Sequence, residues 1–312
     1  MKRIRIGVVG FGNLGRACVE VISERSCLFE LVAVFSRRTV KGTVALSKIE
    51  EYKDKIDVLL VCVGSCTDAP VVMPLLVSNF CTVDSFDNHA KLSEYIERIK
   101  SSQGEKVSIV GTGWDPGVFS LMRIYFDAIL VPLSNSSLKS SQTFWGEGVS
   151  LGHSNAVRRI QGVKDAIQFT VPKKDAIEAV RVGEVIGAEK KHKRVCYVVA
   201  QKCEQDRIEQ EIRTMPNYFA GQEVEINFVS WAEFEKHYRG RFEHGGLVFG
   251  NDGKSQMEFK LKLESNPYYT ACVMVAYAIA CCKLVEEEKY GVYTVADIAP
   301  RYLSFENVIN KI

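Results

Sequence analysis

The sequence carries almost no excess charge of either sign. Its 312 residues include 40 lysines and arginines against 38 aspartates and glutamates, which leaves a net charge of +2. Such a balance suggests neither nucleic acid nor an anionic membrane surface as a partner. The chain is 46% hydrophobic and 25% charged, a composition that excludes a disordered or collagen-like protein. A chain of this length is expected to form about two domains.

The sequence also lacks a hydrophobic run long enough to cross a bilayer. Its most apolar stretch, residues 271–282, has 12 residues, whereas a membrane-spanning helix needs ~20. The N-terminus places charge before a short apolar segment, but it has neither the length nor the cleavage site of a signal peptide. We therefore expect no membrane association.

No cysteine pattern of a metal or redox motif is present among the ten cysteines. Cys62 and Cys66 are close in sequence, Cys281 and Cys282 are adjacent, and the others are scattered, which matches no zinc or thioredoxin spacing. Most of them lie in apolar runs, as buried free thiols do. These features predict no metal site and favour the reducing cytoplasm as the compartment.

The N-terminal part of the chain alternates strand-like and helix-like segments. Short apolar runs bounded by Gly, Ser or Asp predict strands at residues 4–9, 31–35, 58–63, 81–84 and 107–110. Their uninterrupted apolar character is typical of a parallel sheet that is covered on both faces. Helical patterns lie at residues 14–24 and 92–101. This alternation predicts a doubly wound, Rossmann-type α/β domain.

After about residue 118 the pattern changes. Alternating or β-branched segments predict a largely antiparallel sheet with strands at residues 166–171, 194–200, 223–229 and 257–263. Helical patterns intervene at residues 175–182 and 204–214. The polar run 134–142 is the best candidate for an exposed connection between domains, and the chain contains no internal repeat. A second domain of α+β type is expected.

A glycine motif follows the first predicted strand directly and precedes the first predicted helix. RIGVVGFGNLG places Gly10, Gly12 and Gly15 in G-x-G-x-x-G spacing. In dinucleotide-binding folds the first glycine permits a tight turn, the second admits the pyrophosphate, and the third lets helix and strand pack closely. The helix N-terminus then offers N–H groups to the phosphates. The alternative is a turn whose glycines serve backbone shape only.

The segment after the second predicted strand, FSRRT, contains no acidic residue. An NAD-dependent enzyme usually places an acid there to hold the ribose hydroxyls. Ser36, Arg37 and Arg38 instead offer a hydroxyl and two guanidiniums, which suit a 2′-phosphate. The segment therefore predicts NADP as the cofactor, with two solvated loop arginines as the alternative.

Further loops follow the carboxyl ends of the predicted strands, where open α/β sheets bind ligands. They extend the expected cofactor site to Asn13, Leu14, Gly64, Ser65, Cys66, Thr67, Ser85, Phe86, Asp87, Thr112, Gly113, Trp114, Asp115, Pro116 and Gly117. Asp87 and Asp115 could face the nicotinamide from neighbouring strands. Each could equally be a turn residue or a helix cap.

Ten motifs occur in an order that resembles the meso-diaminopimelate dehydrogenase family. They are VVGFGNLGR, FSRR, CVGSCTD, CTVDSFDNH, TGWDPGVFS, TFWGEGVSLGHS, HKR, RTMPNYF, HGG and NPYYTA. The resemblance covers nearly the whole chain. It implies a cytoplasmic, homodimeric, NADP-dependent enzyme of lysine biosynthesis. Such an enzyme reversibly deaminates the D-centre of meso-2,6-diaminopimelate, giving ammonia and L-2-amino-6-oxopimelate, which cyclises to tetrahydrodipicolinate.

The resemblance also implies which residues contact the substrate. Asp87 and Asp115 are expected at the D-centre as the catalytic residues. The other implied contacts are Trp145, Ser150, Leu151, Gly152, Thr170, Arg194, His244 and Asn266. Of these, Thr170, Arg194, His244 and Asn266 are expected to hold the L-centre. A substrate with two ammoniums and two carboxylates needs both acceptors and cationic or hydroxyl donors. Taken singly, His244 could be a loop histidine and Trp145 a core residue.

The resemblance further implies how the domains divide the work. Residues 1–118 are expected to bind the cofactor, completed by helices at about 268–312, and residues 119–267 to bind substrate and build the dimer. Two alternatives stay open. One is another NADP-dependent Rossmann oxidoreductase, of the sugar or dihydrodipicolinate type, although TGWDPG occupies the stretch where a sugar dehydrogenase carries its catalytic lysine or histidine. The other is an NADP-sensing protein without turnover.

Overall fold

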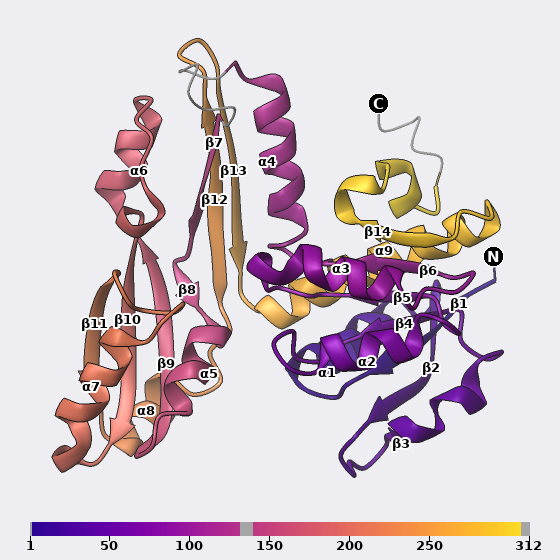
Figure 1. Ribbon diagram of the computed structural model, residues 1–312, viewed down its shortest axis with the longest axis horizontal. Coiled ribbons are helices and arrows are strands. Elements are labelled where there is room, and N and C mark those ends of the chain that lie inside the picture. Colours follow the sequence, from indigo (N-terminus) through magenta and orange to yellow (C-terminus); the bar gives the residue numbers. More distant parts are fainter. Residues whose placement is uncertain (1, 132–139, 307–312) are drawn as a thin grey trace. The chain divides into compact units, whose positions relative to one another are not determined.

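The computed structural model describes residues 2–131 and 140–306, and Figure 1 shows its course. The chain divides into two compact units. The first comprises Met1–Leu121 and Pro267–Ile312, and the second comprises Met122–Asn266. The first eight residues after Val131, which include most of the predicted connection 134–142, lie outside the described residues.

The first unit is built on one parallel sheet of seven strands. Its strands are β1 (Ile4–Val9), β2 (Phe29–Ser36), β3 (Val44–Ala45), β4 (Val58–Val61), β5 (Thr82–Asp84), β6 (Val107–Val110) and β14 (Gly291–Thr294). The strand order is β14-β6-β5-β4-β1-β2-β3, and every neighbouring pair is parallel. Because the order reverses between β1 and β4, a ligand-binding crevice is expected at the carboxyl ends of these two strands.

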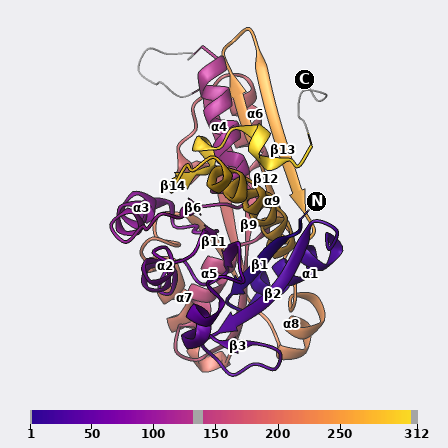
Figure 2. The ribbon, with the colours of Figure 1, turned by 90° about the vertical axis from the view of Figure 1, so that its right-hand side faces the viewer.

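Helices cover both faces of this sheet. The helices α1 (Asn13–Glu24) and α9 (Asn266–Glu286) contribute to the core on one face. The helices α2 (Ala69–Leu76) and α3 (Leu92–Lys100) and the 3₁₀ helix η1 (Leu46–Tyr52) contribute to the core on the other. Figure 2 shows α2 and α3 on the side of the sheet opposite α1. The predicted doubly wound Rossmann-type fold is confirmed.

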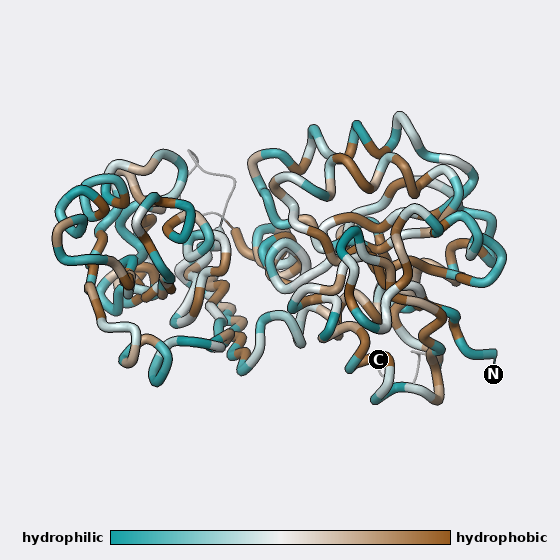
Figure 3. Tube along the Cα trace, turned by 90° about the horizontal axis from the view of Figure 1, so that it is seen from below, coloured by the Kyte–Doolittle hydropathy of each residue, from teal (hydrophilic) through white to brown (hydrophobic). Residues whose placement is uncertain are grey.

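Successive side chains of these strands point to opposite faces of the sheet, and both faces are covered, which explains why the strand sequences are continuously apolar. In β1, Ile6 and Val8 point into one core, whereas Val9 belongs to the other. In β4, Leu60 lies in the first core and Leu59 in the second. Since successive side chains of a strand face opposite ways, both faces must be apolar when both are covered. Figure 3 shows the resulting hydrophobic segments in the middle of this unit.

The helix α9 is longer than the apolar run that the sequence draws attention to. The helix has 21 residues, and a window of 18 of them has a mean hydropathy of 1.6, so it would pass for a membrane span by length and composition. Eleven of its residues are buried, among them Ala271, Met274, Val275 and Ala278. These side chains belong to the core beneath the parallel sheet, together with those of β1 and β4. The apolar character of α9 is therefore that of a core helix.

The second unit contains two sheets. Its strands are β7 (Ser141–Trp145), β8 (Gly148–Val149), β9 (Val163–Pro172), β10 (His192–Ala200), β11 (Glu223–Phe228), β12 (His244–Asn251) and β13 (Gln256–Leu263). One sheet has the order β11-β10-β9-β8 and the other has the order β13-β12-β7. All pairs are antiparallel except β10 with β11, which is parallel. The predicted α+β character is confirmed, with two sheets in place of one.

Helices pack against both sheets of the second unit. They are α4 (Val118–Ile129), α5 (Leu151–Arg158), α6 (Lys174–Arg181), α7 (Gln205–Thr214) and α8 (Trp231–His237). The boundary between the units falls within α4, after Leu121. The helices α5 and α7 share a core with β9 and β10. The helix α6 packs on β7 and β12 through Ala176 and Val180.

Short 3₁₀ turns occur in both units. Those of the first unit are His89–Lys91, Val295–Asp297 and Pro300–Leu303, and those of the second are Ala188–Lys190 and Lys202–Glu204.

Candidate functional site

The glycine motif forms the turn that its spacing predicts. Gly10 has a φ of +97°, and a Cβ added to it would lie 2.5 Å from the carbonyl oxygen of Cys62. A Cβ on Gly15 would lie 2.0 Å from the carbonyl oxygen of Gly10. Neither position tolerates a side chain. A Cβ on Gly12, by contrast, would meet nothing within 4 Å. The loop is thus tight at its ends and open at its middle glycine, where a phosphate can approach the backbone.

The helix α1 begins in this loop with its N-terminus uncapped. Gly12 is the N-cap residue, no side chain caps it, and the first turn contains no acid. A cavity of 540 Å³ opens beside it, where β1, β2 and β4 end. Its lining residues are Val9, Gly10, Phe11, Gly12, Phe35, Ser36, Arg37, Arg38, Leu46, Cys62, Val63, Gly64 and Asp68. Free N–H groups and a positive helix end make this cavity an anion site.

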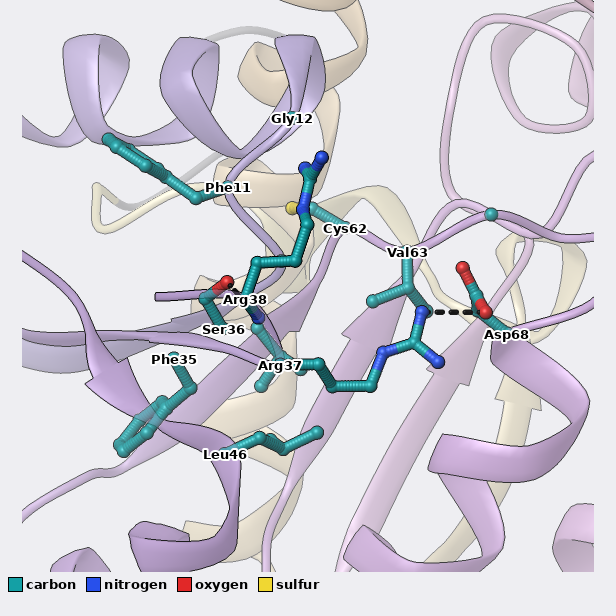
Figure 4. A pocket seen from close by; sticks show the side chains of 13 residues that line it. Phe11, Gly12, Phe35, Ser36, Arg37, Arg38, Leu46, Cys62, Val63 and Asp68 are labelled. Atoms are coloured by element: carbon teal, nitrogen blue, oxygen red, sulfur yellow. Dashed lines mark hydrogen bonds and ion pairs between the residues drawn. The ribbon is translucent and has the colours of Figure 1, made fainter. Parts of the chain in front are cut away.

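The two arginines after β2 lie in this cavity but take different directions, as Figure 4 shows. Arg37 extends toward α2 and forms an ion pair with Asp68, with 2.7 Å between Nη2 and Oδ1. Arg38 extends toward the glycine loop, and its backbone N–H donates to Ser36 Oγ at 3.0 Å. Asp68 is the last residue of the motif CVGSCTD, but the sequence analysis did not predict it as a site residue. This acid follows the motif's Gly64–Thr67 loop directly, and it faces the arginines predicted to bind a 2′-phosphate.

The other predicted cofactor residues occupy the neighbouring strand ends of the same unit. Gly64 lines the cavity, whereas Ser65, Cys66 and Thr67 are not part of its lining. The hydroxyl of Ser65 accepts a hydrogen bond from the backbone N–H of Asp87 at 3.1 Å. This bond joins the loop after β4 to the loop after β5. The motif CVGSCTD therefore serves two places, since its glycine lines the cavity and its serine binds the backbone of Asp87.

A buried acid that the sequence did not single out connects the loops after β5 and β6. Asp84, 1% exposed, accepts hydrogen bonds from the backbone N–H groups of Phe86 (2.8 Å) and Gly111 (3.1 Å) and from the Tyr95 hydroxyl (3.1 Å). Its carbonyl oxygen accepts from the N–H and hydroxyl of Thr112. Burial raises the pKa of Asp84 to about 6, although these hydrogen bonds oppose the rise. Asp84 thereby holds the segments that carry Asp87 and Asp115.

The two predicted catalytic aspartates differ in their surroundings. Asp87 is exposed. The side chain of Asp115 is only 1% exposed, and its Oδ1 lies 3.9 Å from Nε2 of His89, a residue of the loop after β5. The loops that carry the two aspartates thus approach each other at His89. Burial changes the proton affinity of a carboxylate, so an exposed and a buried carboxylate are suited to different steps in the binding and deprotonation of a substrate ammonium.

In the second unit, Thr170 and Arg194 are direct partners. They face each other across β9 and β10, and Nη1 of Arg194 donates to Oγ1 of Thr170 at 2.5 Å. The Nε of Arg194 donates to Oε1 of Gln222 at 2.7 Å. No carboxylate pairs with this guanidinium among the described residues. Burial lowers the pKa of Arg194 to about 10, which leaves it charged at neutral pH with neutral partners only.

The two sheets of this unit meet at Gly148. Gly148 pairs with Thr170 in one sheet, and a Cβ added to it would lie 2.3 Å from the Cα of His244 in the other. His244 is buried and is the first residue of β12, not a loop residue. Asn266 joins this region because its N–H donates to the carbonyl oxygen of Phe242 at 2.9 Å.

Trp145 and the loop before α5 border the same region. Trp145 is half-buried at the end of β7, and its N–H donates to Nε2 of His192 at 2.8 Å. Ser150, Leu151 and Gly152 begin α5, where Ser150 Oγ lies 2.9 Å from Nδ1 of His153. The second unit therefore brings together the residues predicted for the L-centre. Three residues of this region were not predicted, namely His153, Gln168 and Gln222. His153 lies within the motif TFWGEGVSLGHS, whereas Gln168 and Gln222 lie outside the motifs and are found only through their contacts with Thr170 and Arg194.

Comparison with known proteins identifies the family. The model of the diaminopimelic acid dehydrogenase C-terminal domain matches residues 113–265. Meso-diaminopimelate D-dehydrogenases of Ureibacillus thermosphaericus and Lysinibacillus sphaericus are 42% and 44% identical to this chain, over 96% of it and 94% of each relative. That of Corynebacterium glutamicum is 39% identical over 99% of this chain and 98% of the relative. The chain belongs to the meso-diaminopimelate D-dehydrogenase family.

Solved structures of this family support the assignment. C. glutamicum DAP dehydrogenase in complex with DAP matches with a TM-score of 0.92 at 38% identity, covering 99% of this chain and 98% of that one. An engineered D-amino acid dehydrogenase bound to NADP⁺ matches with a TM-score of 0.86, again at 38% identity, over 99% of this chain and 98% of that one. Family membership sets aside the sugar-dehydrogenase and NADP-sensor alternatives.

Proposed function

We infer that this protein is an NADP-dependent meso-diaminopimelate D-dehydrogenase of lysine biosynthesis. It catalyses the reversible oxidative deamination of the D-centre of meso-2,6-diaminopimelate to L-2-amino-6-oxopimelate, the open form of tetrahydrodipicolinate, and ammonia. The observation that carries this conclusion is the identity of about 40% with enzymes of this one activity along nearly the whole chain. The geometry of each unit fits the two halves of the reaction.

The first unit fits NADP. Gly10, Gly12 and the uncapped start of α1 suit the pyrophosphate. Ser36, Arg37 and Arg38, which line the same cavity, suit the 2′-phosphate. NADP supplies the hydride acceptor when it is bound. The chain's own residues must then orient the substrate and handle its protons.

Asp87 and Asp115 are proposed to act at the D-centre. A hydride can leave Cα only after the ammonium has lost a proton, because the nitrogen lone pair must form the imine. Water then adds to that imine, and a base promotes this addition. Both aspartates follow ends of strands in the parallel sheet, and Asp84 fixes the segments leading to them. We propose that they bind the ammonium first and transfer these protons afterwards.

Thr170, Arg194, His244 and Asn266 are proposed to hold the L-centre. Arg194 supports this role because a half-buried guanidinium whose partners among the described residues are a hydroxyl and an amide can still gain from an anion. The substrate carboxylate supplies that anion. Trp145 and the Ser150-Leu151-Gly152 segment are proposed to complete the substrate contacts.

The second unit is further proposed to form the homodimer. It exposes large apolar side chains on α4 and on the segment after α6, namely Ile124, Tyr125, Ile129, Val131, Val182 and Val185. Such groups on a globular protein commonly mark an interaction surface. We also propose a cytoplasmic location, in agreement with the ten free cysteines. Light scattering of the purified protein measures the oligomeric state directly.

The experiment that tests the proposed function follows NADPH formation spectrophotometrically with meso-diaminopimelate at alkaline pH. Turnover with NADP, and little with NAD, is the expected result. The matched variant Arg194→Met removes the cation and keeps an unbranched side chain. It should raise the KM for meso-diaminopimelate while leaving NADP binding unchanged. The proposed function would be contradicted if the unmodified enzyme neither formed NADPH from meso-diaminopimelate nor consumed NADPH with L-2-amino-6-oxopimelate and ammonia.

A further inference from the structure

One buried polar group in the second unit has no partner within the described chain. Gln168, on β9, is fully buried, and its Oε1 forms no hydrogen bond. It is the one buried side-chain nitrogen or oxygen of the described residues in this condition. Because buried polar atoms in folded proteins almost always pair, such an exception needs an explanation, and an unfilled ligand contact is one.

The orientation of the Gln168 amide follows from its neighbour Thr170. The two residues are two positions apart on β9 and so lie on the same face of the sheet. The Nε2 of Gln168 donates to Oγ1 of Thr170 at 3.4 Å, and Nη1 of Arg194 donates to the same oxygen at 2.5 Å. With two donors on this oxygen, the Thr170 hydroxyl keeps its own proton to give to another acceptor.

These three side chains together have the chemistry that an α-amino acid needs. The Arg194 guanidinium and the Thr170 hydroxyl are donors, as a carboxylate requires. Oε1 of Gln168 is an acceptor, and the Nε2 of the same amide group donates to the Thr170 hydroxyl. An ammonium next to the carboxylate requires such an acceptor. We propose that Oε1 of Gln168 accepts a hydrogen bond from the ammonium at the L-centre of the substrate. This assignment rests on the proposed function and extends it to a residue outside the family motifs.

The backbone around Gln168 is fixed from the opposite side. Its N–H donates to Oγ of Ser154 at 2.9 Å, and its carbonyl oxygen accepts from the N–H of Ser150 at 2.9 Å. Ser154 in turn donates to the carbonyl oxygen of Ser150. Gln168 is thus tied to the segment Ser150-Leu151-Gly152, which is itself proposed to contact the substrate. An acceptor held in place before binding loses little conformational entropy when the ligand arrives.

The assignment also gives Gln168 a part in specificity. An amino acid with the D-centre and the distal carboxylate, but without the distal amine, would leave Oε1 unpaired. A site built around a substrate hydrogen bond discriminates strongly against an analogue that lacks it. Gln168 should therefore favour meso-diaminopimelate over D-2-aminopimelate, which differs from it only in the missing L-amine.

The test compares these two substrates in Gln168→Met, which keeps the length of the side chain and removes the acceptor. The KM for meso-diaminopimelate should rise about 10- to 150-fold, the range for a lost hydrogen bond to a charged group. Its kcat should stay within about threefold, because the contact is made equally in ground and transition states. For D-2-aminopimelate the KM should change by less than about threefold. If the enzyme does not oxidise this analogue, its inhibition constant is measured instead.

Gln222→Met is the matched control. Gln222 touches the opposite side of the same guanidinium through its Oε1, so its loss acts through Arg194 and the carboxylate. It should weaken both substrates by similar factors. If Gln168→Met also weakens both equally, or weakens neither, Gln168 does not bind the L-ammonium and the inference fails, whereas the proposed function stands as long as the unmodified enzyme oxidises meso-diaminopimelate.

A second variant covers the case in which Gln168→Met does not fold. Gln168→Glu keeps an acceptor oxygen at the same distance along the side chain. It should retain or increase the preference for meso-diaminopimelate over D-2-aminopimelate. A lost preference in this variant would overturn the assignment. An unmodified enzyme without activity on meso-diaminopimelate would remove the proposed function and this inference with it.

Discussion

The charged residues proposed for the site differ in their burial and in their partners, and these differences support different roles for them. Arg194 is half-buried among neutral partners, Arg37 is exposed and paired with an acid, and the side chain of Asp115 is buried beside a histidine. A cation that is partly removed from water and has no counter-ion gains most from an anionic ligand. An exposed ion pair contributes little by itself and exchanges partners at low cost.

Asp87→Asn and Asp115→Asn test the proton chemistry. Each variant preserves the shape of the side chain and removes its charge. We expect kcat to fall ~10²–10⁴-fold, the usual effect of losing an acid–base group, with NADP affinity nearly unchanged. Steady-state kinetics and a fluorescence titration with NADPH give the two quantities. Near-normal turnover of both variants at saturating substrate would exclude an essential role, and a collapse of NADP affinity would place the residues in the cofactor site.

Arg37→Ala tests the choice of cofactor. Loss of one charge-assisted hydrogen bond to the 2′-phosphate should weaken NADP binding roughly 10- to 150-fold, and NAD binding should be spared because NAD has no phosphate there. Equilibrium titration with both cofactors is the measurement.

Asp68→Asn is the counterpart of this variant. It frees Arg37 from an exposed ion pair of 2.7 Å, so NADP affinity should rise about 1.4- to 5-fold, the range expected for such a pair. If the unmodified enzyme bound NADP and NAD equally well, Arg37 and Arg38 would not have the proposed role of binding the 2′-phosphate.

At the scale of elements, the chemistry lies where strands end. The ends of β1, β2 and β4 border the cavity proposed for the cofactor. The segments after β5 and β6 carry the two aspartates, and β8 joins the two sheets of the second unit. Asp84 shows how one residue organises two elements, since its carboxylate and carbonyl bind the segments after β5 and β6 at once.

Asp84→Asn should change how stability depends on pH. The pKa of Asp84 is about 6 in the folded protein against an ordinary 3.8, so between these values the folded state keeps a proton that the unfolded state releases. The stability of the unmodified protein should therefore fall relative to the variant as pH rises through this window, by about 3 kcal/mol in total. Denaturant unfolding of both proteins at about pH 4 and about pH 7 measures the difference. A difference independent of pH would show that Asp84 ionises normally.

Gly148→Ala tests the junction of the two sheets. Its new methyl group would lie 2.3 Å from the Cα of His244 and 2.6 Å from the carbonyl oxygen of Glu243. Backbone atoms cannot move aside cheaply, so we expect a loss of about 1–3 kcal/mol of stability and a raised KM for the substrate. Gly152→Ala is the control for stability, because its methyl group would meet nothing within 4 Å. Equal stability of the two variants would contradict close packing at Gly148.

The sequence predicted the elements whose pattern is local and missed those that depend on contacts. Five of the seven parallel strands were predictable because burial on both faces forces continuous apolar runs, as in β1 and β6. The short edge strands β3 and β14 are not fully buried and were not predicted. The strand β12 was not, because its HGG start is typical of a loop and only pairing with β7 and β13 makes it a strand. Asp68 and Asp84 carry no spacing signal. Their roles follow from Arg37 and from the N–H groups of Phe86 and Gly111.

At the scale of the whole molecule, the residues proposed for the reacting D-centre and those proposed for the L-centre belong to different units. The proposed cofactor residues and both aspartates belong to the first, and the residues proposed for the L-centre belong to the second. The chain returns to the first unit through α9, whose apolar side chains complete one core of the parallel sheet, and β14 extends that sheet at its edge.

The stereochemistry of turnover tests this account most directly. If Thr170, Arg194, His244 and Asn266 hold an L-centre, only a D-centre can present its hydrogen to the nicotinamide. NADPH formation should be measured with the meso and the L,L isomers of 2,6-diaminopimelate at equal concentrations. The account predicts oxidation of the meso isomer and none of the L,L isomer, which should act at most as an inhibitor. Comparable turnover of the two isomers would contradict it.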